Sequence, residues 1–369
     1  MQFLKRVRIP TKTFGGFAIV LVLLLITGGV GVVGMMKGGG LFAQYRELAA
    51  EANASANVAA GMMDTQLAVK TYMITPSPDS AEAVRAEETA LLEELTAKRA
   101  LFNDPAKLAQ LDEVEAKISA YKAAFEEAVV RETRRQELVQ DTLAALGPEL
   151  AATLTDIMRG ANADDDARAA FEAAQVQERF LLARLYVEKF VTGAAQADFE
   201  RAVQELEKLD AQASDMLSEL RNPARRELAR RFLDGEKRYA QALTQVYDAI
   251  TARNAIIRGE LDVIGPQVME IAYGLKKENQ AREAELGARA NALLMTLEIV
   301  VAVVVVVALG FGAAIAWLIG TGIARPIRAM TDAMKRLAAG DHGVEIPAQD
   351  HEDEIGAMAE AVAVFKQNA

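Results

Sequence analysis

The sequence predicts an all-α membrane protein: two transmembrane helices, a six-helix domain folded as two stacked four-helix bundles, and a C-terminal parallel coiled coil. Three observations support this prediction. The 369 residues are 51% hydrophobic, with nine prolines and no cysteine, a composition that favours helices. Two long runs carry no charged residue. The sequence between these runs repeats its landmarks at a constant offset.

The first uncharged run covers residues 13–36 and follows Lys5, Arg6, Arg8 and Lys12. Basic residues before a first span place the N-terminus, residues 1–12, in the cytoplasm. The run is longer than the hydrophobic region of a signal peptide, and no Ala-x-Ala cleavage site follows it. We therefore expect residues 13–36 to form an uncleaved transmembrane helix.

The second uncharged run covers residues 299–319. As a helix it would be about 31 Å long, enough to cross a hydrocarbon core of about 30 Å. Arg325 and Arg328 follow it, and a short hinge is expected at Gly320-Thr321-Gly322. The second transmembrane helix is therefore assigned to residues 298–319, with residues 37–297 on the outer side of the membrane.

Residues 37–297 read as helices with few breaks, because apolar residues recur there at intervals of three and four. Helix-breaking clusters lie near Pro76, Asp104-Pro105, residues 160–164, Gly193 and Asn222-Pro223. The predicted helices are 41–75, 80–102, 105–159, 166–192, 196–221 and 223–290.

Landmarks in this region recur at an offset of 118 residues. Asp104-Pro105 matches Asn222-Pro223, Tyr121 matches Tyr239, Arg135 matches Arg253, and Gly147-Pro148 matches Gly265-Pro266. Helix lengths then place two long helices through both bundles, each kinked at its Gly-Pro pair. The membrane-proximal module is expected at 40–135 with 253–290, and the distal module at 136–252.

The residue inventory argues against an enzyme. Residues 37–297 contain no histidine or cysteine, and neither a phosphate-binding glycine loop nor a nucleophile elbow is present. We therefore expect no catalytic residue, metal or cofactor. Acidic residues outnumber basic ones in this region, which argues against nucleic acid and anionic lipid as partners.

A ligand site between helices is the better hypothesis, because bundle cores host such sites. Arg179 and Arg184 flank an apolar seam beside Tyr186. An arginine partly shielded from water can hold a carboxylate through bonds worth about 1.5–3 kcal/mol each. The sequence thus predicts a small anionic ligand, with the distal module favoured.

Three further polar residues interrupt apolar stripes and are candidates for the same site. They are Arg135, Arg253 and Asn254. The alternative for these arginines is a structural role, capping the junction between modules or pairing with Glu132.

The C-terminal region carries two short heptad patterns joined by a linker. Residues assigned to signal transmission are Pro326, Ile327, Met330, Met334 and Leu337 in the first segment, Val344 and Ile346 in the linker, and Glu354, Ile355, Met358 and Val362 in the second. Two such short helices cannot bury their apolar seams alone. A homodimer with a parallel four-helix coiled coil is therefore expected.

Residues 320–369 resemble the HAMP domain of bacterial transmembrane receptors. The resemblance rests on Pro326, the Gly340-Asp341 connector and the Asp353-Glu354-Ile355-Gly356 start of the second helix. The whole layout resembles a methyl-accepting chemotaxis receptor, and residues 37–297 resemble the helical bimodular sensor class in length and two-module plan.

This resemblance implies a bacterial inner-membrane protein with residues 37–297 periplasmic and both termini cytoplasmic. It implies a small organic acid as ligand, and homodimers that could join larger receptor arrays. A kinase and a coupling protein would be reached only through a signalling part that follows Ala369 in such receptors and is missing here. The expected signal is a shift of the last sensor helix against the first, which moves the second span and changes HAMP packing.

Two other interpretations remain open from the sequence. The chain could be the input half of a sensor histidine kinase or cyclase, which also use HAMP linkers. Alternatively, the outer bundle could dock a periplasmic binding protein through exposed tips near 160–165 or 192–196.

Overall fold

The computed structural model describes residues 7–368, and no strand occurs among them. The helices are α1 (Ile9–Ile74), α2 (Pro78–Arg99), α3 (Pro105–Glu137), α4 (Ala144–Ala163), α5 (Ala167–Gly193), α6 (Gln196–Glu219), α7 (Pro223–Ile256), α8 (Asp262–Ile319), α9 (Arg325–Ala338) and α10 (Glu354–Asn368). Three π-helical segments, η2 (Leu138–Leu143), η3 (Ile257–Leu261) and η4 (Gly320–Ala324), join consecutive α-helices. The all-α prediction is confirmed.

The chain divides into two compact units, which are described separately. One unit is Ala50–Asn279, and the other combines the segment through Ala49 with the segment from Gln280 onward. The first unit holds two separate apolar cores, each enclosed by four helices. The predicted pair of four-helix bundles is therefore present.

Side-chain caps fix where the helices of the first unit begin. The Ser77 hydroxyl accepts a hydrogen bond from the Ser80 amide, the Asp104 carboxylate from the Ala106 amide, and the Asn222 side chain from the Ala224 amide. Each cap precedes a proline at the first helical turn, where a missing N–H costs nothing.

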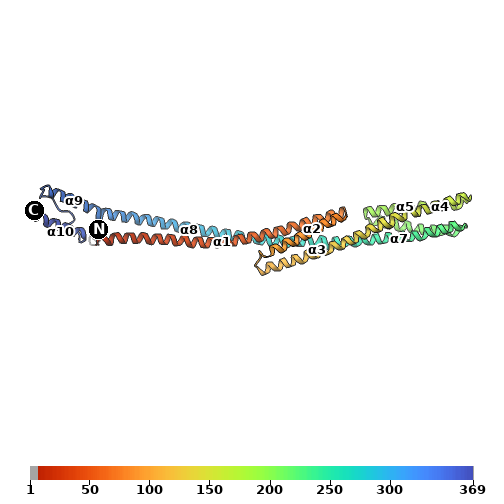
Figure 1. Cartoon of the computed structure of the whole chain (residues 1–369), viewed down its shortest axis with the longest axis horizontal. Coiled ribbons are helices and arrows are strands. Elements are labelled where there is room, and N and C mark those ends of the chain that lie inside the picture. The colour runs from red at the N-terminus through yellow and green to blue at the C-terminus, as the bar shows by residue number, and fades with distance from the viewer. Residues whose placement is uncertain (1–6, 369) are drawn as a thin grey trace. The chain divides into compact units, whose positions relative to one another are not determined.

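The proximal module packs α1, α2, α3 and the start of α8 around one core (Figure 1). Met62, Tyr72, Ile118, Phe125 and Leu275 are among its fully or nearly fully buried side chains. The rings of Tyr72 and Phe125 meet edge to face, with centroids 5.3 Å apart. Such aromatic contacts hold α1 against α3.

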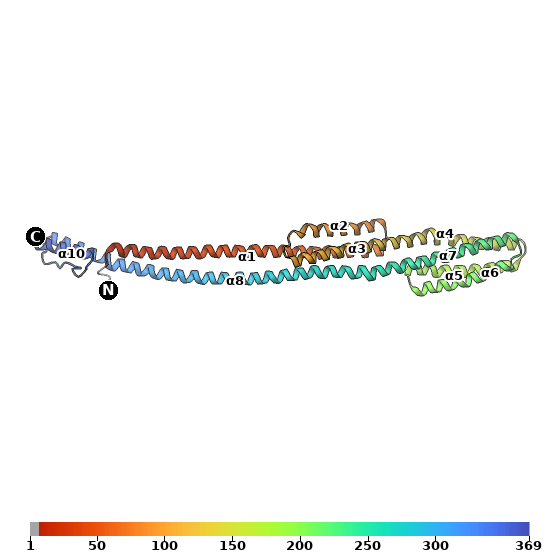
Figure 2. The same cartoon turned by 90° about the horizontal axis from the view of Figure 1, so that it is seen from below.

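The distal module packs α4, α5, α6 and α7 around the second core. Phe180 lies at its centre, with its ring edge to face against both Phe232 and Tyr239 at 5.7 Å. Figure 2 shows α5 and α6 as a hairpin alongside α7. A second aromatic group, with Phe199 stacked on Tyr247 at 4.0 Å, packs between α6 and α7.

The turn between α5 and α6 is exposed, as expected for 192–196, but it lies at the other end of the α5–α6 hairpin from the turn after α4 (Figure 2). The Arg225 guanidinium bonds Asp164, so the end of α4 and the start of α7 meet at the tip. Because α5 reverses direction immediately after α4, its C-terminal end returns toward the start of α4 (Figure 2). The connection near 160–166 lies at the tip together with the connection from α6 to α7, where Asn222 donates to Asp164 at 3.1 Å.

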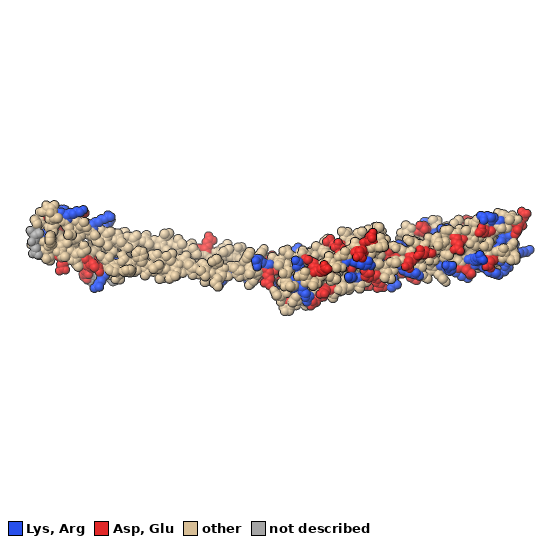
Figure 3. Space-filling view, in the orientation of Figure 1, with Lys and Arg blue, Asp and Glu red and all other residues tan. Residues whose placement is uncertain are grey.

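Two helices of the described chain are long and apolar enough to cross a membrane. They are Ile9–Ile74 and the continuous helical run Pro223–Ala338. Figure 3 shows that the apolar stretch carries few charged side chains, whereas charged side chains are dense over the helices from α2 to α7. At Gly320-Thr321-Gly322, where a hinge is expected, the helix continues into α9 through the π-helical segment η4.

The C-terminal helices α9 and α10 enclose a small core with the segment between them. Met330, Leu337, Val344, Ile346 and Ala359 are buried there. Gly340 has a φ of 90°, which permits the chain to leave α9 without steric strain. A Cβ at Gly356 would overlap the His351 carbonyl, which explains the glycine in the Asp-Glu-x-Gly motif.

Candidate ligand-binding site

Arg184 on α5 is the candidate residue whose charge has no acidic partner among the described residues. Its guanidinium lies over Gly147 of α4, where a Cβ would stand 2.9–3.2 Å from the Nε, Cζ and Nη2 atoms. The same group lies 6.0 Å from the centroid of the Phe180 ring. It also hydrogen-bonds the side chain of Tyr239, whose pKa burial raises to about 12. A glycine notch, a cation and a neutral phenol thus come together inside the distal module.

This arrangement suits a small anion. An unpaired guanidinium offers several N–H donors in a planar fork that matches a carboxylate. The neutral Tyr239 hydroxyl can donate one more hydrogen bond. The apolar face of Phe180 supplies contact for a short carbon chain.

Arg179 and Tyr186 lie in a different group, between α5 and α6. Arg179 donates to Glu205 at 2.8 Å and to Gln212 at 3.1 Å. Glu205 is buried and also pairs with Arg201, whose guanidinium stacks 5.5 Å from the Tyr186 ring centroid. Arg179 therefore has an acidic partner, which it shares with Arg201 and Lys208, and the contact holds α5 to α6.

Arg135, Arg253 and Asn254 form a third group at the junction of the modules. The Glu132 carboxylate is buried and accepts from Arg135 at 2.7–3.1 Å and from Arg253 of α7. Asn254 accepts from Arg253 at 3.1 Å. The structure thus places these arginines in the alternative structural role, tying α3 to α7.

The repeat relates the Arg184 notch to a matching place in the proximal module. There the Gln66 amide of α1 lies over Gly265 of α8. Gln66 precedes Arg184 by 118 residues, and Gly265 follows Gly147 by 118 residues. Tyr121, the counterpart of Tyr239, is buried in the same module. In both places a polar side chain lies over the glycine of a Gly-Pro pair, but only in the distal module is that side chain a cation.

Sequence reasoning missed Gly147, Phe180 and Tyr239 as parts of the site. In the sequence, Gly147 and Tyr239 stand out only as landmarks of the repeat. The same offset pairs Arg184 with Gln66, and in the structure each of these two side chains lies over the glycine of a Gly-Pro pair.

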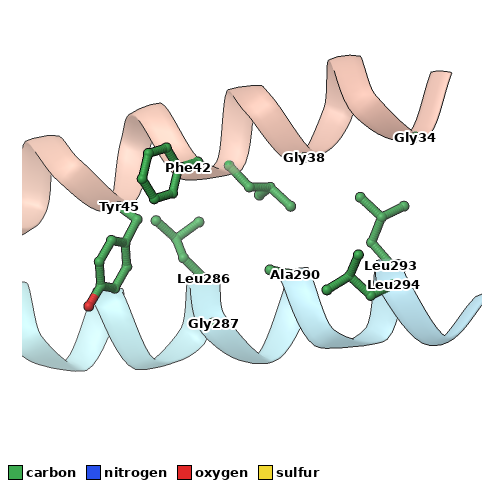
Figure 4. A pocket seen from close by; sticks show the side chains of 10 residues that line it. Gly34, Gly38, Phe42, Tyr45, Leu286, Gly287, Ala290, Leu293 and Leu294 are labelled. Atoms are coloured by element: carbon green, nitrogen blue, oxygen red, sulfur yellow. The ribbon is translucent and has the colours of Figure 1, made fainter. Parts of the chain in front are cut away.

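An apolar cavity of about 290 Å³ lies between α1 and α8, in the unit that combines the segment through Ala49 with the segment from Gln280 onward (Figure 4). Gly34, Gly38, Phe42, Leu286 and Leu294 are among its lining residues. It contains no basic side chain, so its chemistry does not suit an organic acid.

The residues assigned to signal transmission divide into a buried and an exposed set. Met330, Leu337, Val344, Ile346 and Ile355 are buried and Val362 is partly buried. Ile327, Met334 and Met358 are exposed. Met334 lies seven residues from Ile327, so alternate seam positions of α9 face outward. This uncovered stripe is what a second copy would bury.

The start of α10 bonds the N-terminal end of α1. Glu354 accepts from the Ile9 amide at 2.8 Å, and Asp353 accepts from Lys12 at 2.7 Å. Asp353 also caps α10 by accepting from the Ile355 amide at 3.1 Å. The N-terminal end of α1 is therefore bonded directly to the start of α10, while Pro326 lies in the first turn of α9.

Comparisons with known proteins agree with this architecture. Residues 51–289 match the helical bimodular sensor domain, and residues 318–369 match the HAMP domain. A protein from Sinorhizobium fredii described as the probable chemoreceptor y4sI is 36% identical over 87 residues. That match covers 24% of this chain and 11% of the relative.

The sensor match covers more than half of the chain and coincides with the two bundles, and the HAMP match covers η4 to α10. The chain therefore belongs to the helical bimodular sensor domain family, and it joins that sensor to a HAMP domain in the manner of a chemoreceptor-like membrane receptor.

Proposed function

We propose that the distal module binds a small organic acid at Arg184 and that the sensor passes this event through α8 and HAMP to a chemotaxis signalling domain. The observation that carries the proposal is the unpaired Arg184 guanidinium over Gly147, beside Tyr239. The sensor region is proposed to face the periplasm, with both termini in the cytoplasm.

The route of the signal follows one helix. Pro223–Ala338 runs without interruption from the distal module, past Tyr239, into the HAMP helix α9. An anion held between Arg184 of α5 and Tyr239 of α7 would draw these helices together. A shift of an ångström or two along α7 would reach α8, because a continuous helix transmits axial displacement.

The Arg184→Gln variant tests the ligand site. The full chain in nanodiscs is titrated calorimetrically with acetate, succinate and citrate. Loss of one charge-assisted interaction should weaken binding of the preferred acid by about 10–100-fold. The matched control is Arg159→Gln, an exposed arginine of the same module that pairs only with Asp156 among the described residues.

Equal loss in both variants would mean that net charge, not the notch, governs binding. Unchanged affinity in Arg184→Gln would place the acid elsewhere. If none of the three acids binds the unmodified chain at millimolar concentration, the organic-acid proposal fails.

The dimer is tested at Met334, which is 50% exposed on the uncovered seam of α9. A glutamate there would bury a charge in the four-helix coiled coil, so Met334→Glu should weaken self-association by about tenfold or more. Chemical cross-linking of the full chain in detergent at graded concentrations measures this. Ala329→Glu, on the outer side of the same helix, is the control and should leave the dimer intact.

A further inference from the structure

Glu88 is a carboxylic acid placed inside the core of the proximal module. It lies on α2 in the buried stripe formed with Val84 and Leu91, and its exposed fraction is 0%. Neither Oε1 nor Oε2 has a hydrogen-bond partner in the part of the chain that the structure describes. Buried polar groups are normally paired, so this carboxyl requires a separate explanation.

The charged neighbours of Glu88 do not compensate an ionised carboxylate. On its own helix, Arg85 is already held by Glu126 of α3, with Nε–Oε1 at 2.7 Å and Nη2–Oε2 at 3.0 Å. Lys122 on α3 favours the ionised form, whereas Glu126 opposes it.

Among the described residues, α1 and α8 add no cation to Lys122 and Arg85. A Cβ on Gly61 of α1 would lie 3.0 Å from Leu91, and this register brings Thr65 to the level of Glu88. The Thr65 hydroxyl already donates to the Gly61 carbonyl at 2.8 Å. From α8, Asp262 acts on the neighbouring Tyr121 and adds a further negative charge.

We propose that Glu88 is a proton-binding site that controls the packing of α2. When Glu88 is protonated, α2 packs into the proximal module; when Glu88 is ionised, α2 loosens from α1 and α3. An ionised carboxylate cannot remain dry and unpaired, and rolling α2 outward is the simplest way to hydrate it. Among the described residues, three side-chain contacts oppose that movement. Besides the Arg85–Glu126 pair, Asn57 of α1 donates to Glu94 of α2 at 2.9 Å, and Arg99 at the end of α2 pairs with Asp112 of α3 at 2.5 Å.

The direction of the pH effect follows from the burial of the group. Desolvation raises the pKa of Glu88 from 4.5 to about 7. Between these values the folded protein keeps a proton that the unfolded chain has released. The stabilisation is therefore complete below pH 4.5 and is lost as pH rises through about 7.

Hydrogen exchange of the full chain in nanodiscs tests the proposal at pH 6.0 and pH 8.5. After correction for the intrinsic exchange rate, the α2 amides should exchange about tenfold faster at pH 8.5. In Glu88→Gln, which carries no ionisable group, this difference should disappear. Glu87→Gln, at the exposed neighbouring position, should keep the full difference.

The local readout also separates Glu88 from Glu236 of α7, whose pKa burial and the nearby Asp210 raise to about 7 in the distal module. A pH-dependent change confined to α7 would assign the effect to Glu236. A pH dependence of α2 that persists in Glu88→Gln, or its absence from the unmodified chain, would overturn the proposal. If Glu88→Gln fails to fold, Glu88→Leu provides a second uncharged variant, with the same outcomes expected.

Discussion

Replacing Lys107 with methionine is expected to lower the free energy of unfolding of the sensor by about 3–5 kcal/mol. Lys107 is 3% exposed and its ammonium bonds both the Glu51 carboxylate of α1 and the Asn279 amide of α8. Removing the cation would leave Glu51 buried without a counter-charge. Denaturant titration of the full chain in detergent, followed by circular dichroism, measures the loss.

The double variant Glu51→Leu/Lys107→Met separates a lost ion pair from lost packing. Both charges are then absent, so most of the lost stability should return. Lys117→Met on the same helix is the control, because its ammonium is partly exposed and should cost less than about 1 kcal/mol. A double variant as unstable as Lys107→Met would contradict the ion-pair explanation.

Replacing Glu132 with glutamine is expected to cost about 2–4 kcal/mol. The glutamine would leave Arg135 and Arg253 side by side with no anion between them. The value lies below that for a fully buried pair because the two arginine side chains are 18–20% exposed. The same denaturant titration measures it.

Glu137→Gln is the matched control for this second prediction. Glu137 lies five residues farther along α3 and contacts Arg134 at 3.4 Å on an exposed surface. Its loss should change stability by no more than about 0.5 kcal/mol. If the two variants were equally stable, Glu132 would not be holding the module junction together.

Both predictions concern helices that lead toward the membrane. The Lys107 cluster ties α1, α3 and α8, and Glu132 ties α3 to α7. The repeat counterpart of Lys107 is Arg225, which holds Asp164 at 2.6 Å and Asp166 at 2.9 Å at the distal tip. Each module therefore closes one end with a buried cation in the first turn of a helix, α3 in the proximal module and α7 in the distal module.

The local sequence was sufficient to predict the helices and the two membrane spans. The uncharged runs predict the two spans because a charge in hydrocarbon is costly, and spacing of three and four predicts helices because it fits 3.6 residues per turn. The 118-residue repeat predicts two bundles. Around Met330 and Ile355, apolar residues recur at intervals of three, four and three. This spacing predicts two short helices that need a second copy of the chain to bury their apolar faces. None of these inferences requires knowledge of a distant contact.

Only the tertiary structure decided which polar residues are buried and which partners they bind. Arg179 and Arg184 both flank the α5 seam, yet one meets Glu205 of α6 and the other Gly147 of α4. Glu88 reads like any other helix carboxylate in the sequence, but it is buried without a hydrogen-bond partner among the described residues. For Glu132 the sequence left open whether it pairs with the arginines, and the structure places it between Arg135 and Arg253. The physical reason is that burial and pairing depend on partners far away in the chain, as with Lys107 and Asn279, 172 residues apart.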